Sequence, residues 1–286
     1  MGQKSCVLLK HSSSSLNKLE YEISYKYLPN GSLASEEKVE WTNTGDVSNS
    51  QKVYNYSGKN KLSSITHLLN NEFQKTVYYV FDKKDNQVDE YTSFNPQPVV
   101  KNPVTIASNG NLTKNFYDES GKITGKELKE YNATGNLLKR EIRDADDNVA
   151  FSYTFNYTGN TLKAKSKFDQ VGKIEEVNRY AYNSQGLLEA DSTFVNGMLN
   201  SIMTYTYDAN KLKTKQTHYS SDLEPDYYIT YEYNNQDQLV KETFYYHGEM
   251  LHSTESEYDT FGNKVKEIYK DQKPLRVKTW EYSCPK

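Results

Sequence analysis

The chain has 286 residues, of which 26 are Tyr, and its mean hydropathy is −0.90. An aromatic content of 13% and a formal net charge of −3 exclude a disordered chain, because disorder goes with few aromatic residues and high net charge. The balanced charge offers no basic patch for nucleic acid, and no apolar run is long enough for a membrane helix. A chain so poor in aliphatic residues is expected to fold as thin repeated units without a thick core.

Residues 1–20 precede the first clear repeat and are expected to form an N-terminal leader or cap, which could be flexible. Cys6 lies here, and the other cysteine, Cys284, lies near the opposite end. Three interpretations are open: two unrelated thiols, a disulfide that would imply a closed shape, or Cys6 as a lipid-anchored cysteine after signal cleavage. The unrelated thiols are favoured, because pairing cannot be deduced from sequence and the ends of an extended array lie far apart.

From residue 21 onward a short phrase recurs about every 25 residues, a period that indicates a repeat architecture. It reads aromatic, any residue, aromatic, then Asn or Asp, then a polar or Gly turn, then an aliphatic residue, as in YTYDANKL at 205–212. We expect residues 21–286 to form one continuous array. The second aromatic of the phrase stands at Tyr131, Tyr157, Tyr182, Tyr207, Tyr233, Tyr258 and Tyr282.

Each period predicts a β-hairpin. Residues i and i+2 of a strand share a face, so the paired aromatics fit a strand that runs into a turn, where Asn or Asp can bond its own backbone. A second turn falls halfway through each period, as at Asn196-Gly197, a strong hairpin signal. The prediction is an all-β fold of about twenty strands, in which tandem antiparallel hairpins form one long twisted or spiralling β-meander sheet.

Two features could interrupt this array. Residues 137–149 and 173–182 could be read as helices, but they are in register with hairpin neighbours, so strands are expected. Residues 94–104 read FNPQPVVKNPV and hold three of the seven prolines, which disfavour a central strand. We expect a break or a long loop there.

Side-chain alternation predicts one apolar-aromatic face and one solvated face. Along 162–168, Leu162 and Phe168 fall on one face and three lysines on the other. Along 199–207, Met203 and Tyr205 fall on the apolar face and threonines on the other. The tyrosines and the lysines are therefore expected on opposite faces.

On successive hairpins the paired tyrosines would form a ladder along the sheet. Packing between repeats is the favoured interpretation, because periodic residues usually serve the fold. The functional interpretation is an aromatic platform for sugar rings or another extended ligand, since Tyr has an apolar body and a polar tip. The candidate binding surface comprises Tyr180, Tyr182, Tyr205, Tyr207, Tyr231 and Tyr233.

The sequence contains no phosphate loop, zinc-protease motif or nucleophile elbow, so no catalytic or cofactor-binding residue is predicted and the chain is expected not to be an enzyme. Asp144, Asp146 and Asp147 could suggest Ca²⁺, but the segment lacks the glycine and terminal Glu of an EF-hand. An acidic hairpin turn is the favoured interpretation, and no metal ligand is predicted.

The segments YDESGKI at Tyr117, YNATGNLL at Tyr131, YNSQGLL at Tyr182 and YDTFGNKV at Tyr258 resemble the YD repeats of RHS-type proteins. That resemblance implies long antiparallel sheets, which can spiral into a shell, on surface or secreted bacterial proteins. We expect a YD-repeat protein without the core or toxin modules of that family. The expectation is a non-enzymatic surface, secreted or periplasmic protein that binds a glycan or protein partner, with no transmembrane segment and with a lipid anchor in a longer precursor. The alternatives are a structural spacer or shell module and, with less support, a carbohydrate-active enzyme.

Overall fold

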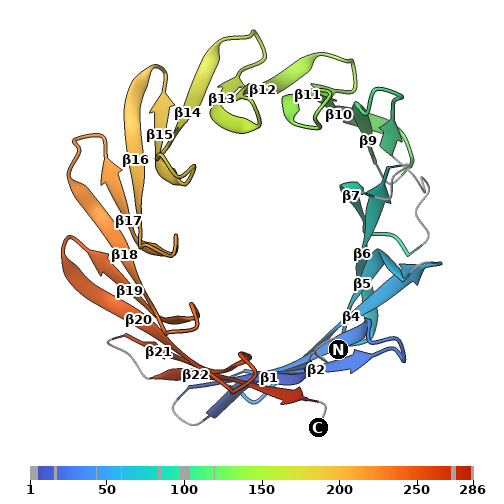
Figure 1. Ribbon diagram of the computed structural model, residues 1–286. Coiled ribbons are helices and arrows are strands. Elements are labelled where there is room, and N and C mark those ends of the chain that lie inside the picture. Colours follow the sequence, from blue (N-terminus) through green and yellow to red (C-terminus); the bar gives the residue numbers. More distant parts are fainter. Residues whose placement is uncertain are drawn as a thin grey trace. The chain divides into compact units, whose positions relative to one another are not determined.

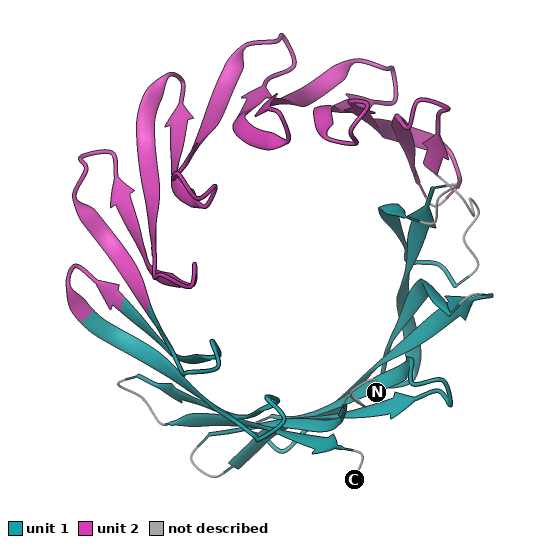
Figure 2. Cartoon of the chain, viewed as in Figure 1, with its two compact units in different colours: residues 1–98, 231–244, 250–286 teal, residues 99–230, 245–249 magenta. Residues whose placement is uncertain are grey.

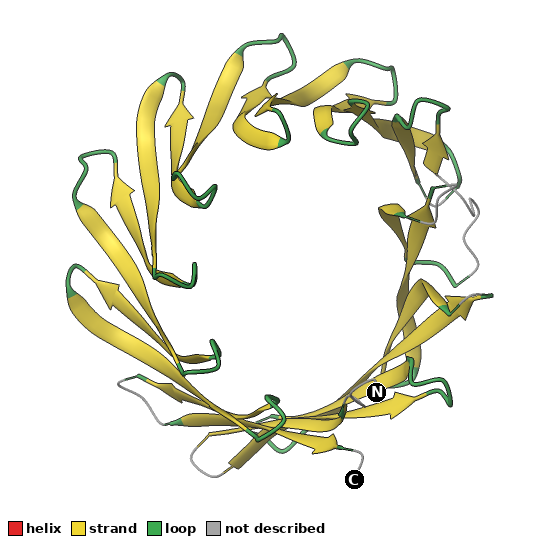
Figure 3. Ribbon diagram, in the orientation of Figure 1, coloured by secondary structure: helices red, strands yellow, loops and turns green. Residues whose placement is uncertain are grey.

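The computed structural model describes residues 6–15, 18–42, 44–58, 60–82, 86–96, 104–118, 120–271 and 275–284. These residues form 22 strands in one antiparallel sheet, and none of them forms a helix (Figures 1 and 3). The prediction of an all-β sheet of consecutive hairpins is confirmed, and 137–149 and 173–182 are strands and turns. No described segment is therefore a helix that could cross a membrane.

The strands are β1 (Val7–Ser15), β2 (Lys18–Tyr27), β3 (Leu33–Trp41), β4 (Val47–Ser57), β5 (Lys61–Leu69), β6 (Glu72–Phe81), β7 (Gln87–Ser93), β8 (Val104–Ile106), β9 (Leu112–Tyr117), β10 (Ile123–Tyr131), β11 (Leu137–Asp144), β12 (Val149–Thr158), β13 (Thr161–Phe168), β14 (Ile174–Tyr182), β15 (Leu188–Val195), β16 (Met198–Tyr207), β17 (Lys213–Ser220), β18 (Pro225–Tyr233), β19 (Leu239–Tyr246), β20 (Glu249–Tyr258), β21 (Lys264–Lys270) and β22 (Arg276–Ser283).

The chain divides into two compact units (Figure 2). Unit 1 comprises residues 1–98, 231–244 and 250–286, and unit 2 comprises residues 99–230 and 245–249. Within each unit, strands that are consecutive in the chain pair antiparallel, for example β2 with β3 in unit 1 and β14 with β15 in unit 2. Of the expected break at 94–104, residues 97–103 lie outside the described part of the chain.

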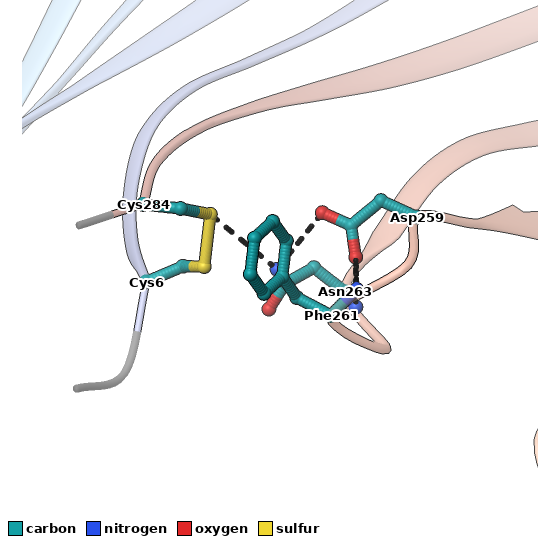
Figure 4. The surroundings of a disulfide bond; sticks show 5 residues. All are labelled: Cys6, Asp259, Phe261, Asn263 and Cys284. Carbon is teal, nitrogen blue, oxygen red and sulfur yellow. Dashed lines mark hydrogen bonds between the residues drawn. A yellow bond between two sulfur atoms is a disulfide. The ribbon is translucent and has the colours of Figure 1, made fainter. Parts of the chain in front are cut away.

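In unit 1 the first and last strands of the chain are neighbours. β1 pairs with β2 on one side and with β22 on the other, and Ser12 and Thr279 share a side-chain hydrogen bond of 2.8 Å across the second pairing. Beside this pairing, Cys6 and Cys284 form a disulfide across 278 residues of sequence (Figure 4).

The favoured prediction of two unrelated thiols is therefore wrong. It assumed that the ends of the array lie far apart, whereas the pairing of β1 with β22 places the two cysteines side by side. Because Cys6 is bonded to Cys284, Cys6 is also not a lipid-anchored cysteine. Residues 1–20, expected as a leader or cap, contain β1, and an anchor elsewhere in a longer precursor stays a prediction.

The turn that follows each phrase, here called a phrase turn, is organised by its Asn or Asp. The Asn183 Oδ1 atom accepts the backbone N–H groups of Gln185 and Leu187, each at 3.0 Å. Gly186 donates its N–H to the Asn183 carbonyl at 3.0 Å and has a φ of 78°, which favours glycine. The same bonds from side-chain oxygen to backbone recur at Asn132, Asn234 and Asp259. The predicted role of the Asn or Asp is confirmed.

Lys211 occupies the position of Gly186 in the next phrase turn of unit 2, with a φ of 67°. A non-glycine residue is strained there by roughly 1 kcal/mol. We expect Lys211→Gly to leave the free energy of unfolding unchanged or raise it by up to about 1 kcal/mol, and Gly186→Ala to lower it by about 1 kcal/mol. Urea denaturation of both variants measures this; equal effects of the two changes would show that the turn does not select glycine.

The turns halfway through each period, here called mid-period turns, lie at the other end of the hairpins. At Asn196-Gly197 both residues have positive φ, 49° and 82°, as a type I′ turn requires. His247-Gly248 follows the same pattern, with φ values of 46° and 85°. The hairpin predicted at Asn196-Gly197 is confirmed.

The predicted separation of tyrosines from lysines is wrong. Lys165 pairs with Phe155 on one side and Asn178 on the other, so it shares their face, and its Nζ lies 4.6 Å from the ring centroid of Tyr153. Lys163 likewise lies 4.8 Å from the Tyr182 ring. Each lysine gains a cation–π contact there.

A β-bulge beside the phrase turns of the regular repeats explains the error. In β14 and β15, Tyr182 pairs with Leu188, but the next pair is Ala181 with Ala190, so one residue of β15 is extra. Beyond an extra residue, each side chain of the strand lies on the face opposite to the one that simple alternation predicts. Asp191 therefore shares the face of Leu188 and Tyr180, although alternation alone places Asp191 opposite Leu188.

Few side chains are fully buried. Among the described residues, only Val104 and Leu112 are buried apolar side chains, and most others are half-buried. The other buried side chains are seven small hydroxylated residues and two glutamates, namely Ser13, Ser64, Thr76, Ser166, Thr217, Thr243, Ser253, Glu127 and Glu141. These described residues form thin layers, as the composition predicted.

Candidate binding face

A row of five side chains crosses the strands of unit 2 on one face of the sheet. Tyr180 on β14 pairs directly with Asp191 on β15, Asp191 with Met203 on β16, Met203 with His218 on β17, and His218 with Tyr227 on β18. Directly paired residues project from the same face, so the row is continuous. We call this row, together with Tyr205, the tyrosine face of unit 2.

Asp191 is the charged centre of the tyrosine face. Partial burial raises the pKa of its carboxyl above the usual value, and a hydrogen bond from the Tyr205 hydroxyl opposes that rise. Burial and the nearby Asp191 charge likewise raise the pKa of Tyr180 and of Tyr205. Both phenols therefore remain protonated, with hydroxyl donors beside one acceptor carboxylate. Such a group can bind a neutral ligand that is rich in hydroxyls.

His218 and Tyr227 form the other end of the row. Their rings stack with centroids 4.8 Å apart and planes at 9°. The His218 Nδ1 atom lies 3.4 Å from an Asp226 carboxylate oxygen, so the two form an ion pair when His218 is protonated. The row thus ends in a flat aromatic surface beside an acidic group.

Sequence reasoning missed Asp191 and His218. Simple alternation from Leu188 places Asp191 on the opposite face, and no sequence motif marks His218. The bulge beside the phrase turn, which aligns Asp191 with Tyr180, the first Tyr of the phrase, becomes visible only in the strand pairing.

In four phrases the hydroxyl of the second Tyr bonds the backbone of the preceding hairpin. The Tyr207 hydroxyl donates to the Leu188 carbonyl at 2.7 Å, 19 residues earlier in the preceding hairpin. Tyr258 donates to the Leu239 carbonyl at 2.8 Å with the same separation. Tyr27 and Tyr56 also donate to the carbonyls of earlier leucines, Leu8 and Leu33. These hydroxyls join successive hairpins, which favours the packing interpretation for the second Tyr.

The six predicted residues therefore differ in their surroundings. Tyr180 and Tyr205 lie beside Asp191 on the tyrosine face, whereas Tyr207 bonds a backbone carbonyl and Tyr182 lies under Lys163. Tyr231 and Tyr233 end β18 and belong to unit 1, where both are half-buried. The structure brings two of the six, Tyr180 and Tyr205, to one carboxylate.

We expect Tyr207→Phe to lower the free energy of unfolding of unit 2 by about 1 kcal/mol, because the Leu188 carbonyl loses its hydroxyl donor. Urea denaturation measures this change. Tyr153→Phe is the control, since its ring contacts lysine through the π face. If the two variants are equally stable, the Tyr207 hydroxyl does not join the hairpins.

Unit 1 has a shallow groove of about 290 Å³, lined by Leu239, Glu242, Thr254, Ser256, Lys264 and Glu267. Burial raises the pKa of the Glu267 carboxyl, but hydrogen bonds from Lys278 at 2.9 Å and Lys264 at 3.0 Å lower it. Together the two lysines hold this pKa below its usual value. A glycosidase acid needs the opposite shift, a raised pKa. Glu267 is an ionised, paired carboxylate suited to binding.

The acidic turn considered as a metal site bonds its own backbone. The Asp144 Oδ1 atom accepts the N–H groups of Asp146 and Asn148 at 2.9 Å, and Asp147 pairs with Lys126 at 2.7 Å. In the described part of the chain, no three His, Cys, Asp or Glu side chains gather as metal ligands. These contacts favour the hairpin-turn interpretation.

No family model and no curated protein matches the chain. Among solved structures, it is similar to a porin-like protein from Bacteroides uniformis, at 11% identity and a TM-score of 0.30, over 96% of this chain and 98% of that one. A porin-like protein from Bacteroides vulgatus gives 11% identity and a TM-score of 0.28, over 98% and 99% of the two chains. The Photorhabdus luminescens Tc holotoxin pore gives 13% identity and a TM-score of 0.25, over 91% of this chain, which spans 19% of the toxin chain. The assignment of function therefore depends on the chain's own residues.

Proposed function

We propose that this chain is a non-enzymatic YD-repeat protein of the bacterial surface or envelope that binds a glycan through the tyrosine face of unit 2. The observation that carries this proposal is Asp191, a partly buried carboxylate that pairs directly with Tyr180 across the strands and accepts a hydrogen bond from the Tyr205 hydroxyl. Aromatic rings can pack against the apolar faces of sugar rings, and a carboxylate accepts strong hydrogen bonds from sugar hydroxyls.

The location outside the cytosol is supported by the disulfide between Cys6 and Cys284. Disulfides form and persist in secreted, surface and periplasmic proteins, whereas cytosolic thiols are kept reduced. The YD-repeat assignment is supported by the phrase turns, because the Asn or Asp after each Tyr organises the turn through its side-chain oxygen.

The test is a glycan panel screened with the wild-type chain and with Asp191→Asn. We expect the wild type to bind at least one class of glycan, and the variant to bind it about tenfold more weakly, because it loses a charge-assisted hydrogen bond. If the wild type binds no glycan of a broad panel, or if the two proteins bind equally well, the proposal is contradicted.

The same variant separates binding from stability. Because burial raises the pKa of Asp191 in the folded state, its charge destabilises the fold at pH values above about 4. Asp191→Asn should therefore be at least as stable as the wild type at pH 7. Any stability difference should shrink as the pH falls and Asp191 becomes protonated in the fold. If Asp191→Asn unfolds more readily at pH 7, the carboxylate serves the fold.

The second candidate function is a purely structural spacer or shell module. It is favoured by the second Tyr of four phrases, whose hydroxyl bonds the preceding hairpin in both units, as at Tyr27 and Tyr207. A structural module would lose stability when either Tyr of a phrase is changed. A glycan-binding protein would lose affinity at the first Tyr alone.

A further inference from the structure

We propose that the mid-period turns of unit 2 form a docking rim for a protein segment that is both basic and apolar. The rim is distinct from the tyrosine face, because it lies at the ends of the hairpins. It comprises the described residues of the turns at 118–122, 145–148, 169–173, 196–197, 221–224 and 247–248, with the strand residues that flank them.

Exposed apolar side chains concentrate on this rim. Among the described residues, unit 2 has nine exposed large apolar side chains; Leu138 lies at the phrase-turn end of its hairpin, and Phe116 lies in β9 two residues before the turn at 118–122. The other seven stand in or beside the mid-period turns: Ile123, Val171, Ile174, Val195, Met198, Leu223 and Tyr246. Val171 is 79% exposed and Met198 is 72% exposed. Turn tips need no such residues for folding, so their repetition indicates a contact surface.

The rim is held in place by backbone contacts between neighbouring hairpins. Asn196 donates its N–H to the Glu175 carbonyl on β14 at 2.9 Å, and His247 donates to the Asp226 carbonyl on β18 at 3.0 Å. Neighbouring strands are about 5 Å apart, so successive turns on the rim are about 10 Å apart. The apolar tips therefore form an ordered row that one extended partner can contact.

The rim is acidic, and this charge indicates which kind of partner it can bind. The described residues of its turns hold six carboxylates and two lysines, namely Asp118, Asp146, Asp147, Asp169, Asp222, Glu224, Lys122 and Lys173. Asp147 is paired with Lys126 and Arg143, whereas Asp222 and Glu224 are exposed on either side of Leu223. The phrase turns of unit 2 hold one acid and one lysine, Asp208 and Lys211.

Apolar tips between carboxylates complement a segment that carries both apolar and cationic side chains. An anionic lipid surface carries the wrong charge for this rim, since the carboxylates would repel it. The phrase-turn side has neither the apolar tips nor the acidic charge. The contrast between the two ends of the hairpins thus points to protein docking at one of them.

The test uses the full chain and two synthetic peptides, an amphipathic Leu/Lys peptide and a Ser/Lys peptide with lysines at the same positions. The rim variant is Met198→Ser with Leu223→Ser, and the control is Leu138→Ser, another exposed apolar residue of unit 2 away from the rim. We expect the Leu/Lys peptide to bind the wild type and Leu138→Ser equally, and the rim variant about tenfold more weakly. The Ser/Lys peptide should also bind the wild type about tenfold more weakly.

Three results would overturn the proposal. Equal binding of the Leu/Lys peptide by the rim variant and the wild type would show that the tips do not contact it. Equal binding of both peptides by the wild type would show that the rim binds through its charge and not through its apolar side chains. Binding to phosphatidylcholine vesicles that is lost in the rim variant would make the rim a lipid-contacting surface. Matching circular dichroism spectra would confirm that the variants are folded.

Discussion

Reduction of the Cys6–Cys284 disulfide should lower the free energy of unfolding of unit 1 by about 5 kcal/mol, the largest effect expected for this protein. The bond spans 278 residues of sequence, and a cross-link over so long a loop removes much of the conformational freedom of the unfolded chain. Without it, β1 and β22 are held together by their backbone ladder and side chains such as Ser12 and Thr279. Urea denaturation with and without reductant measures the change.

The matched control is the double variant Cys6→Ser with Cys284→Ser, which should resemble the reduced wild type and be insensitive to reductant. Hydrogen exchange should also become faster in β1 and β22, since local opening of these strands is no longer restrained. If reductant leaves the unfolding of the wild type unchanged, the bond does not restrain unit 1.

Gly125→Ala should destabilise unit 2 by about 2–3 kcal/mol. Gly125 lies in β10 at a bulge opposite Phe116 of β9, and an added Cβ would lie 2.5 Å from the Arg143 carbonyl oxygen of β11. That contact is with backbone, so relief requires the strands to separate. Thermal unfolding followed by circular dichroism measures the loss.

Gly58→Ala is the control for this change, because an added Cβ there meets nothing within 4 Å and the φ of Gly58 is not positive. Its expected effect is within about 0.5 kcal/mol. Should both alanine variants unfold at the wild-type temperature, β10 and β11 would not approach as closely at Gly125 as the structure shows.

The repeat could be predicted from sequence because its signals are local. The Asn or Asp after each Tyr makes its own turn, as Asn183 does, and Asn196-Gly197 specifies a type I′ turn by its φ values. The period and the strands therefore followed from residues close together in the chain.

Two features of the molecule are not local, and both were mispredicted. The bulge at Tyr182 and Leu188 reverses the faces of the rest of β15, so Asp191 joins the tyrosines instead of facing away from them. The disulfide depends on the pairing of β1 with β22, which no short segment of sequence encodes. The candidate site was therefore predicted in part: Tyr180 and Tyr205 were among the expected residues, but Asp191, His218 and Tyr227 were not.

The most direct test of the proposed binding face is a pair of titrations with the best-binding glycan of the panel, using Tyr205→Phe and Tyr207→Phe. Each variant lacks one hydroxyl on β16. The Tyr205 hydroxyl bonds the Asp191 carboxylate, and the Tyr207 hydroxyl bonds the Leu188 carbonyl. Tyr205→Phe should weaken binding by roughly tenfold, whereas Tyr207→Phe should lower stability by about 1 kcal/mol with little change in affinity. If both variants lose stability and neither loses affinity, the tyrosines of unit 2 serve the fold alone.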